Sequence, residues 1–152
     1  MDVDAFLNKL CAGPHYADQI VHVEELSARA ASYGQLAVPL DTGLQSALKG
    51  IGIDRLYTHQ AAAIDAVRRG EDIILTAGTA SGKTLAYNVP VLERLTKDPM
   101  ARALYLFPTK ALAQDQLRGL DELARGLHYS WLTYGTYDGD TPRSERPVLR
   151  RR

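Results

Sequence analysis

The chain has 152 residues, of which 45% are apolar and 24% are charged, and its 18 basic residues balance its 18 acidic ones. This composition predicts one globular domain with a sizeable core and excludes a disordered chain, while the zero net charge does not indicate a nucleic-acid partner. A single cysteine, Cys11, excludes an internal disulfide and an all-cysteine metal site. The sequence has neither a signal-peptide pattern nor an apolar run of about 18 residues, so we expect a cytoplasmic protein with no membrane partner.

The first 55 residues contain short elements of mixed type. Residues 4–10 have the amphipathic spacing of a short helix, which Gly13-Pro14 would stop. The β-branched run at residues 20–23 predicts a short strand, and residues 42–49 predict a second helix with Gly50 just after its end. None of these patterns carries a specific chemistry, so we expect residues 1–55 to form a small leader region.

From Leu56 onward, helix and strand patterns alternate. Thr58 is a good N-cap for a helix that runs to Arg69 and is closed by Gly70. Three runs predict strands, the first two of them short, continuous apolar runs typical of strands buried on both faces. These runs are residues 72–76, 103–107 and 129–134, with helices expected over residues 82–97 and 109–125 between them. The alternation predicts an α/β fold with a parallel, doubly wound sheet and flanking helices.

The most informative stretch is residues 77–84, Ala-Gly-Thr-Ala-Ser-Gly-Lys-Thr. Its small residues leave backbone N–H groups free to point at phosphate oxygens, and a helix N-terminus follows directly. Lys83 would contact the β- and γ-phosphates and the hydroxyl of Thr84 would bind Mg²⁺. The nucleotide contacts that we expect here are Thr79, Ala80, Ser81, Gly82, Lys83 and Thr84. A glycine- and serine-rich turn with an incidental lysine is the alternative, and the expected strand before and helix after the loop argue against it.

This loop, with Ala77 in its first position, resembles motif I of the superfamily 2 helicases of the DEAD/DEAH-box group. Residues 56–60, Leu-Tyr-Thr-His-Gln, resemble the upstream Q motif of the same group. A glutamine amide can both donate to and accept from the N7 and amino edge of adenine, whereas guanine presents the opposite pattern. The resemblance therefore implies that Gln60, with Tyr57 beside it, selects ATP. Taken alone, Gln60 would be interpreted as a solvated residue at the start of a helix.

Residues 107–114, Phe-Pro-Thr-Lys-Ala-Leu-Ala-Gln, resemble motif Ia, which in these enzymes holds the nucleic-acid backbone. The segment follows the carboxyl end of an expected strand, where α/β sheets place their ligands. Thr109 would cap the next helix and Lys110 would add charge, so that both, with Pro108, are expected phosphate contacts. The alternative is a plain strand-to-helix turn with an N-cap threonine.

Residues 137–142, Tyr-Asp-Gly-Asp-Thr-Pro, complete the set of motifs. Together with the two preceding motifs they resemble the YprA-like helicases, which are RecQ-related in activity and carry a C-terminal cysteine cluster. In that family this stretch lies beside the nucleic-acid path. The resemblance covers residues 56–146, and it implies a RecA-like fold around the phosphate loop.

The charges within and after this last motif have opposite expected roles. Asp138 and Asp140 would repel phosphate, so we expect them to shape the loop. The expected nucleic-acid contacts are Thr141, Arg143 and Arg146. Asp140 or Thr141 could also cap a helix beginning at Pro142.

The resemblance implies an ATP-dependent DNA helicase that unwinds strands with 3′–5′ polarity in DNA repair or recombination. ATP and Mg²⁺ are then the expected cofactors, and nucleic acid is the expected partner, with DNA favoured over RNA. A Walker B Asp-Glu pair should end a buried strand. The pair Asp121-Glu122 instead lies in a helical run, and Glu71-Asp72 precedes a strand.

We therefore expect residues 56–152 to be the N-terminal part of the first RecA-like domain, truncated before Walker B. Such a fragment would bind ATP without turning it over, because it lacks both the Walker B carboxylates and a second domain with arginine fingers. Two alternatives stay open at this point. One is another P-loop enzyme, such as a kinase or a transporter ATPase, and the other is a truncated, non-catalytic nucleotide-binding remnant.

Overall fold

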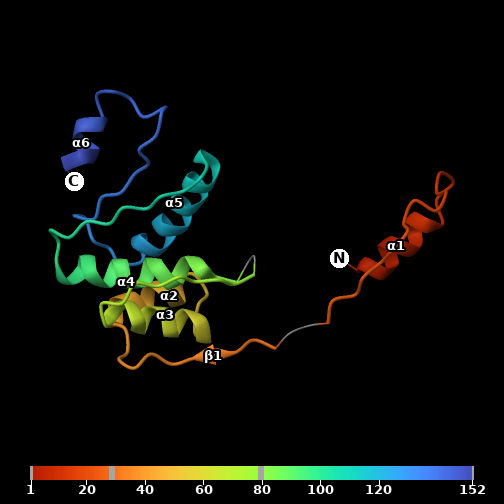
Figure 1. Ribbon diagram of the computed structural model, residues 1–152, viewed down its shortest axis with the longest axis horizontal. Coiled ribbons are helices and arrows are strands. Elements are labelled where there is room, and N and C mark those ends of the chain that lie inside the picture. Colours follow the sequence, from red (N-terminus) through yellow and green to blue (C-terminus); the bar gives the residue numbers. More distant parts are fainter. Residues whose placement is uncertain (1, 28–29, 79–80, 152) are drawn as a thin grey trace. The chain divides into compact units, whose positions relative to one another are not determined.

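The computed structural model describes residues 2–27, 30–78 and 81–151. The chain divides into two compact units, Met1–Ala30 and Ala31–Arg152. The elements in order are α1 (Val3–Cys11), β1 (Tyr33–Gly34), α2 (Thr42–Gly50), β2 (Leu56–Tyr57), α3 (Thr58–Arg68), α4 (Lys83–Lys97), α5 (Lys110–Arg125) and α6 (Arg146–Arg151) (Figure 1). Within the described ranges, no helix has both the length and the apolar character needed to cross a bilayer.

The first unit contains the predicted short helix but not the predicted strand. Helix α1 begins after Asp2, whose carboxylate accepts a hydrogen bond of 3.0 Å from the N–H of Ala5. None of its residues is buried. Residues 20–23 form no strand, and Val21 is 93% exposed. A β-branched run alone does not make a strand, because a strand also needs a neighbour that pairs with its backbone groups.

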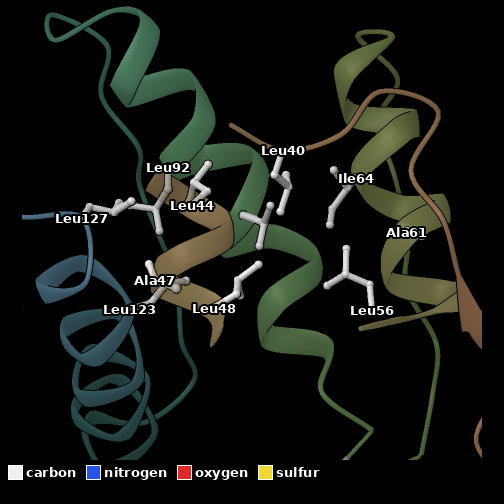
Figure 2. Packing of buried hydrophobic residues seen from close by; sticks show 11 residues of the cluster. Leu40, Leu44, Ala47, Leu48, Leu56, Ala61, Ile64, Leu92, Leu123 and Leu127 are labelled. Carbon is white, nitrogen blue, oxygen red and sulfur yellow. The ribbon is translucent and has the colours of Figure 1, made fainter. Parts of the chain in front are cut away.

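The core of the second unit lies between helices α2, α3, α4 and α5. Its buried cluster consists of Leu40, Leu44, Ala47, Leu48, Leu56, Ala61, Ile64, Val89, Leu92, Leu123 and Leu127. Figure 2 shows these side chains converging between the helices. Leu44, Ile64 and Val89 are completely buried. Burying a side chain of this size stabilises the fold by about 1.5–3 kcal/mol, so this cluster is the main source of stability of the unit.

Polar groups fix the helix ends that the sequence predicts. The Asp41 carboxylate accepts from Leu44 N (2.9 Å) to cap α2, and the Thr109 hydroxyl accepts from Leu112 N (3.2 Å) to cap α5. Helix α3 starts at Thr58 with Tyr57 as N-cap, so the predicted Thr58 cap is wrong by one residue. The reason is Gln60, whose side chain accepts from the N–H of Tyr57 and caps the helix one residue earlier.

Close packing between α2 and α5 depends on a glycine just past the end of α5. A Cβ atom built on Gly126 would lie 2.8 Å from both Cα and Cβ of Ala47 on α2. That distance is well inside van der Waals contact, so a larger residue would push the two helices apart. Gly126 thus both closes α5, as predicted, and permits the approach of α2.

A partly buried ion pair joins α3 to α4. The guanidinium of Arg68 donates two hydrogen bonds to Glu93, of 2.9 and 2.7 Å, and one to the carbonyl oxygen of Val38. Asp65 accepts a fourth bond from this guanidinium at 3.2 Å, and it also accepts from Ala37 N at 2.9 Å. The pairing with Glu93 raises the pKa of Arg68. The network fixes the segment before α2 against both helices.

The predicted parallel sheet does not form among the described residues. Their one sheet is the antiparallel pair β1–β2, in which Tyr33 lies opposite Tyr57 and Gly34 opposite Leu56. Residues 72–76 and 103–107 are extended but form no strand in the described part of the chain. A strand requires a neighbouring strand for its N–H and C=O groups, and these segments are not hydrogen-bonded to each other.

The two extended segments bury only one of their faces. Leu75, Tyr105 and Phe107 are half-buried, whereas Ile74, Leu104 and Leu106 are 94%, 85% and 84% exposed. The sequence predicts burial on both faces, and that prediction is wrong here because nothing described covers the outer face. The third predicted strand, residues 129–134, instead begins with a turn in which Leu132 N donates to the carbonyl oxygen of Tyr129 (3.2 Å).

Candidate nucleotide and nucleic-acid site

The described part of the phosphate loop curls around the side chain of Lys83. The Lys83 ammonium donates to the carbonyl oxygens of Ala77 (2.8 Å) and Gly78 (2.5 Å). The hydroxyl oxygen of Ser81 lies 3.3 Å from the same nitrogen. Helix α4 begins directly after Gly82, as expected of a phosphate loop. Thr79 and Ala80, two of the predicted contacts, lie outside the described residues.

Gly82 stands where the loop turns into α4. Its φ of 72° lies in the left-handed region that favours glycine. A Cβ atom at this position would lie 2.6 Å from the Nε2 of Gln60. Both observations require a glycine, so Gly82 sets the turn and allows Gln60 to reach the loop.

Gln60 is buried and bonded at both ends of its amide. It is only 2% exposed. Its Oε1 accepts from Tyr57 N and its Nε2 donates to the carbonyl oxygen of Gly82, each at 2.8 Å. The interpretation of Gln60 as a solvated helix-start residue is therefore wrong. Through Gln60, the Q-motif segment is hydrogen-bonded to the phosphate loop. His59 Nε2 adds a second contact, 2.9 Å from the carbonyl oxygen of Ser81.

Beside Gln60 lies a stack of flat side chains. The rings of Tyr33 and Tyr57 are 5.4 Å apart and those of Tyr57 and His59 are 5.7 Å apart, with interplanar angles of 18° and 16°. The guanidinium of Arg55 lies 3.7 Å above the ring of Tyr33. Such surfaces can stack on a planar base. Tyr33 belongs to the region that the sequence leaves without chemistry, and it arrives here through the β1–β2 pairing.

Thr84, the predicted Mg²⁺ ligand, is bonded to a residue that the sequence does not single out. Its hydroxyl donates to the Oε1 of Gln116 on α5 at 3.0 Å. The hydroxyl of Tyr87 donates to the same oxygen at 2.6 Å. Gln116 lies two residues beyond the motif at 107–114, and only the packing of α5 beside α4 brings it to the phosphate loop.

A pocket of about 450 Å³ opens beside these groups. It is lined by Ile73, Leu75, Lys83, Thr84, Ala86, Tyr87, Phe107, Leu112 and Gln116. The hydroxyl of Tyr105 is the buried side-chain group without a hydrogen-bond partner among the described residues. Burial, with a smaller contribution from nearby Tyr87, raises the pKa of Tyr105 to about 12. The described residues contain no group of three His, Cys, Asp or Glu side chains that could hold a metal ion.

The predicted phosphate contacts at the start of α5 meet the last motif. Pro108, Thr109 and Lys110 are all exposed. The Lys110 ammonium, 55% exposed, forms a 2.5 Å ion pair with Asp140, which raises the pKa of Lys110. One of the two acidic residues that we expect to shape the loop thus lies directly on a predicted phosphate contact.

Asp138 shapes the loop as predicted. Its carboxylate accepts from the N–H groups of Asp140 (2.8 Å) and Thr141 (3.2 Å), which closes a tight turn. Thr141 is only 8% exposed, and its hydroxyl accepts from Asp138 N at 2.9 Å. Thr141 therefore supports the turn in this structure instead of facing solvent, which differs from its expected role as a phosphate contact.

The arginines after this loop divide into two kinds. Arg146 donates to the carbonyl oxygens of Thr141 (3.0 Å) and Gly139 (3.2 Å), so that it fixes the loop. Arg143 is exposed. The helix predicted to begin at Pro142 begins at Arg146 instead, because residues 142–145 form a turn in which Glu145 N donates to the oxygen of Pro142 at 3.0 Å.

The pair Asp121-Glu122 lies in a helix, as the sequence predicts, whereas Glu71-Asp72 precedes a segment that forms no strand. Asp121 lies within α5, pairs with Arg125 at 2.6 Å and accepts from the Tyr134 hydroxyl at 2.6 Å. Glu71 pairs with Arg69 at 2.6 Å, and this bond lowers the pKa of Glu71. Neither pair touches the phosphate loop through these contacts.

Comparisons with known proteins show the family of the chain. The sequence model of the DEAD/DEAH box helicase family matches residues 57–151. The chain is 43% identical to the ATP-dependent helicase YprA of Bacillus subtilis over 88% of its own length and 18% of YprA. It is 36% identical to the ATP-dependent helicase HRQ1 of Saccharomyces cerevisiae over 98% of its own length and 14% of HRQ1.

A solved structure gives the same result for the fold. A crystal structure of the helicase MrfA bound to DNA and AMPPNP is 40% identical, with a TM-score of 0.81 over 97% of this chain and 20% of MrfA. The chain thus spans less than a fifth of its curated relatives, and the match implies a RecA-like P-loop fold. The chain belongs to the DEAD/DEAH box helicase family, in which it resembles the YprA and Hrq1 helicases.

Proposed function

We propose that the chain is the ATP-binding front part of the first motor domain of a DNA helicase, which couples ATP hydrolysis to strand separation. The observation that carries the proposal is the position of Lys83. Its ammonium lies within the curve of the phosphate loop, 2.8 and 2.5 Å from two loop carbonyl oxygens, at the N-terminal end of α4. A lysine at a helix N-terminus suits the β- and γ-phosphates of a nucleotide.

Gln60 is the proposed adenine contact, with Tyr57 beside it. One lone pair of its Oε1 and one hydrogen of its Nε2 are used by Tyr57 and Gly82. An amide has two lone pairs and two hydrogens, so one of each is left for the adenine edge. Because the same amide holds Gly82, base recognition and the shape of the phosphate loop would depend on one side chain.

The residues beside the loop fit a magnesium ion held through Thr84. The Thr84 hydroxyl gives its proton to Gln116, which leaves the oxygen lone pairs for a hard cation. When bound, Mg²⁺ would neutralise charge that develops on the phosphate oxygens. Among this chain's own groups, Lys83 would then hold the phosphates and Thr84 the ion.

DNA is the proposed nucleic acid, since the solved relative MrfA is bound to DNA. The resemblance to the YprA-like helicases implies 3′–5′ polarity and a role in repair or recombination. Pro108, Thr109, Lys110, Arg143 and Arg146 are the proposed contacts, and Thr141 would support the loop that carries them. Of these, Lys110 and Arg143 offer exposed positive charge.

The experiment is a fluorescence anisotropy titration of a labelled single-stranded DNA with the chain at several salt concentrations. Binding should weaken in Lys110→Ala, and the slope of log affinity against log salt should fall by about 0.7, the value for one phosphate contact to single strands. Lys49→Ala, an exposed lysine at the end of α2, should leave the slope unchanged. Equal slopes in all three proteins would remove Lys110 from the proposed interface.

We further propose that the 152 residues alone do not turn over ATP. Asp121 and Glu71 are engaged with Arg125 and Arg69, so neither is available as a general base. An ATPase assay with and without DNA should therefore stay at background. Turnover that is abolished by Lys83→Ala would contradict this and would require a carboxylate with a second role.

The two extended segments bear on the fold of the whole domain. We propose that residues 72–76 and 103–107 are sheet strands of the RecA-like fold whose ladder partners belong to other parts of the helicase. Their inner residues already pack beside α4 and α5, while Ile74, Leu104 and Leu106 remain bare. Exposed apolar rows of this kind mark surfaces that are covered in an assembled protein.

A further inference from the structure

Gln116 holds a position that the motifs do not explain. It lies on α5, half-buried, and its Oε1 accepts hydrogen bonds from two hydroxyl groups of α4. One of them belongs to Thr84, the proposed Mg²⁺ ligand, and the other to Tyr87 one turn further along. Gln116 also lines the pocket beside Lys83 and Thr84.

The Gln116 atom that faces the two hydroxyl groups is the amide oxygen. The Tyr87 contact is 2.6 Å and the Thr84 contact is 3.0 Å. Bonds between two oxygens are typically shorter than those between nitrogen and oxygen, and 2.6 Å suits O–H···O. An amide nitrogen at this place would instead donate to Thr84 and use up a lone pair that a cation needs.

A threonine hydroxyl can otherwise rotate and direct its proton elsewhere. In a helix it commonly donates back to a carbonyl oxygen of the preceding turn. The bond to Gln116 fixes the proton on the side of α5 and keeps the lone pairs of Thr84 available. Because Tyr87 bonds to the same oxygen, the amide itself is held in one orientation.

We propose, resting on the function proposed above, that Gln116 is a positioning residue for Mg²⁺: it orients the Thr84 hydroxyl so that its oxygen can bind the ion. Gln116 touches neither nucleotide nor metal in this account and acts through Thr84. The helix that carries it begins at Lys110, less than two turns away, so one rigid element bears both this support and a proposed DNA contact.

The test is a titration of the full 152-residue chain with a fluorescent ATP analogue across a range of Mg²⁺ concentrations and in EDTA. In Gln116→Leu, the Mg²⁺ concentration for half-maximal enhancement of nucleotide affinity should rise about two- to tenfold, the effect of one lost hydrogen bond. Affinity in EDTA should stay within about twofold, because the phosphate contacts of Lys83 do not involve Gln116. Gln116→Glu, which keeps an acceptor oxygen, should restore the Mg²⁺ dependence.

The matched control is Gln114→Leu on the same helix, where the side chain is exposed and bonds to the Thr136 hydroxyl at 3.2 Å. It should match the wild type in both conditions. A parallel loss of affinity in EDTA and in Mg²⁺ for Gln116→Leu would show a merely structural role and overturn the inference. An unchanged Mg²⁺ dependence in Gln116→Leu would overturn it as well, while leaving ATP binding intact. Absence of nucleotide binding by the wild type would instead refute the proposed function, and this inference with it.

Discussion

The four packed helices bury their apolar side chains, whereas the two extended segments beside them leave several of theirs exposed. In α2–α5, leucines such as Leu44 and Leu123 are at most 1% exposed, whereas Leu104 and Leu106 of the extended segment are about 85% exposed. A helix pairs its backbone groups within itself, whereas a strand pairs them only with a neighbouring strand. The difference separates the helices, which cover their own apolar faces, from the extended segments, whose outer apolar side chains are exposed.

The largest expected effect is the contrast between two leucine substitutions. Leu44→Ala removes a fully buried side chain from the core cluster and should lower the free energy of unfolding by about 2–5 kcal/mol. Leu104→Ala removes an exposed side chain and should stay within about 0.5 kcal/mol. Urea unfolding followed by circular dichroism measures both. Equal effects would mean that the extended segment is buried after all.

The ion pair between α3 and α4 should have the next largest effect. Glu93→Gln leaves the guanidinium of Arg68 with one charged partner, Asp65, instead of two, which should cost about 1–3 kcal/mol in the free energy of unfolding. Glu122→Gln, an exposed residue of α5, is the control and should have little effect. A stability of Glu93→Gln equal to that of the wild type would show that the pair contributes nothing to holding the helices together.

The approach of α2 to α5 gives a test of about the same size. Gly126→Ala would place a methyl group 2.8 Å from the backbone of Ala47, at an expected cost of about 1–3 kcal/mol. Gly50→Ala at the end of α2 meets nothing within 4 Å, so it should be neutral or slightly stabilising. Thermal unfolding compares the two variants. If both alanines were tolerated equally, the close contact between the helices would not exist in solution.

The sequence predicts the helices well and the extended segments poorly. Helices α1 to α5 lie within one or two residues of their predicted ranges, because caps such as Thr109 and apolar spacing act locally. The strands over 72–76, 103–107 and 129–134 are absent, because strand formation depends on partners that a local pattern does not specify. The sheet that does form among the described residues, β1–β2, is predicted by no pattern in the sequence.

In the site, too, the sequence predicts the residues that are neighbours in the chain and misses those that packing brings together. Lys83, Gly82 and Ser81 lie together at a helix start because the loop and helix are consecutive in sequence. Tyr33 and Gln116 reach the site through packing of distant segments, which no motif indicates. Thr141 turns inward because the Asp138 carboxylate closes the loop around it, a local effect that the charge pattern of the sequence does not indicate.

The smallest expected effect lies in an extended segment. The Tyr105 hydroxyl is buried without a partner among the described residues, and burial raises its pKa to about 12. Tyr105→Phe removes that desolvated group and should raise the free energy of unfolding by up to about 1 kcal/mol. Chemical denaturation of both proteins measures the difference. A loss of more than 1 kcal/mol would show that the hydroxyl has a bonding partner in solution.

Binding of ATP by the loop around Lys83 can be measured by isothermal titration of the chain with ATP and Mg²⁺. Lys83→Ala removes a charged phosphate contact and should weaken binding by about 1.5–3 kcal/mol. Lys97→Ala, an exposed lysine at the other end of α4, should bind like the wild type. Circular dichroism should show the same helix content in all three proteins. Equal affinity of the wild type and Lys83→Ala would show that the loop does not bind ATP through Lys83.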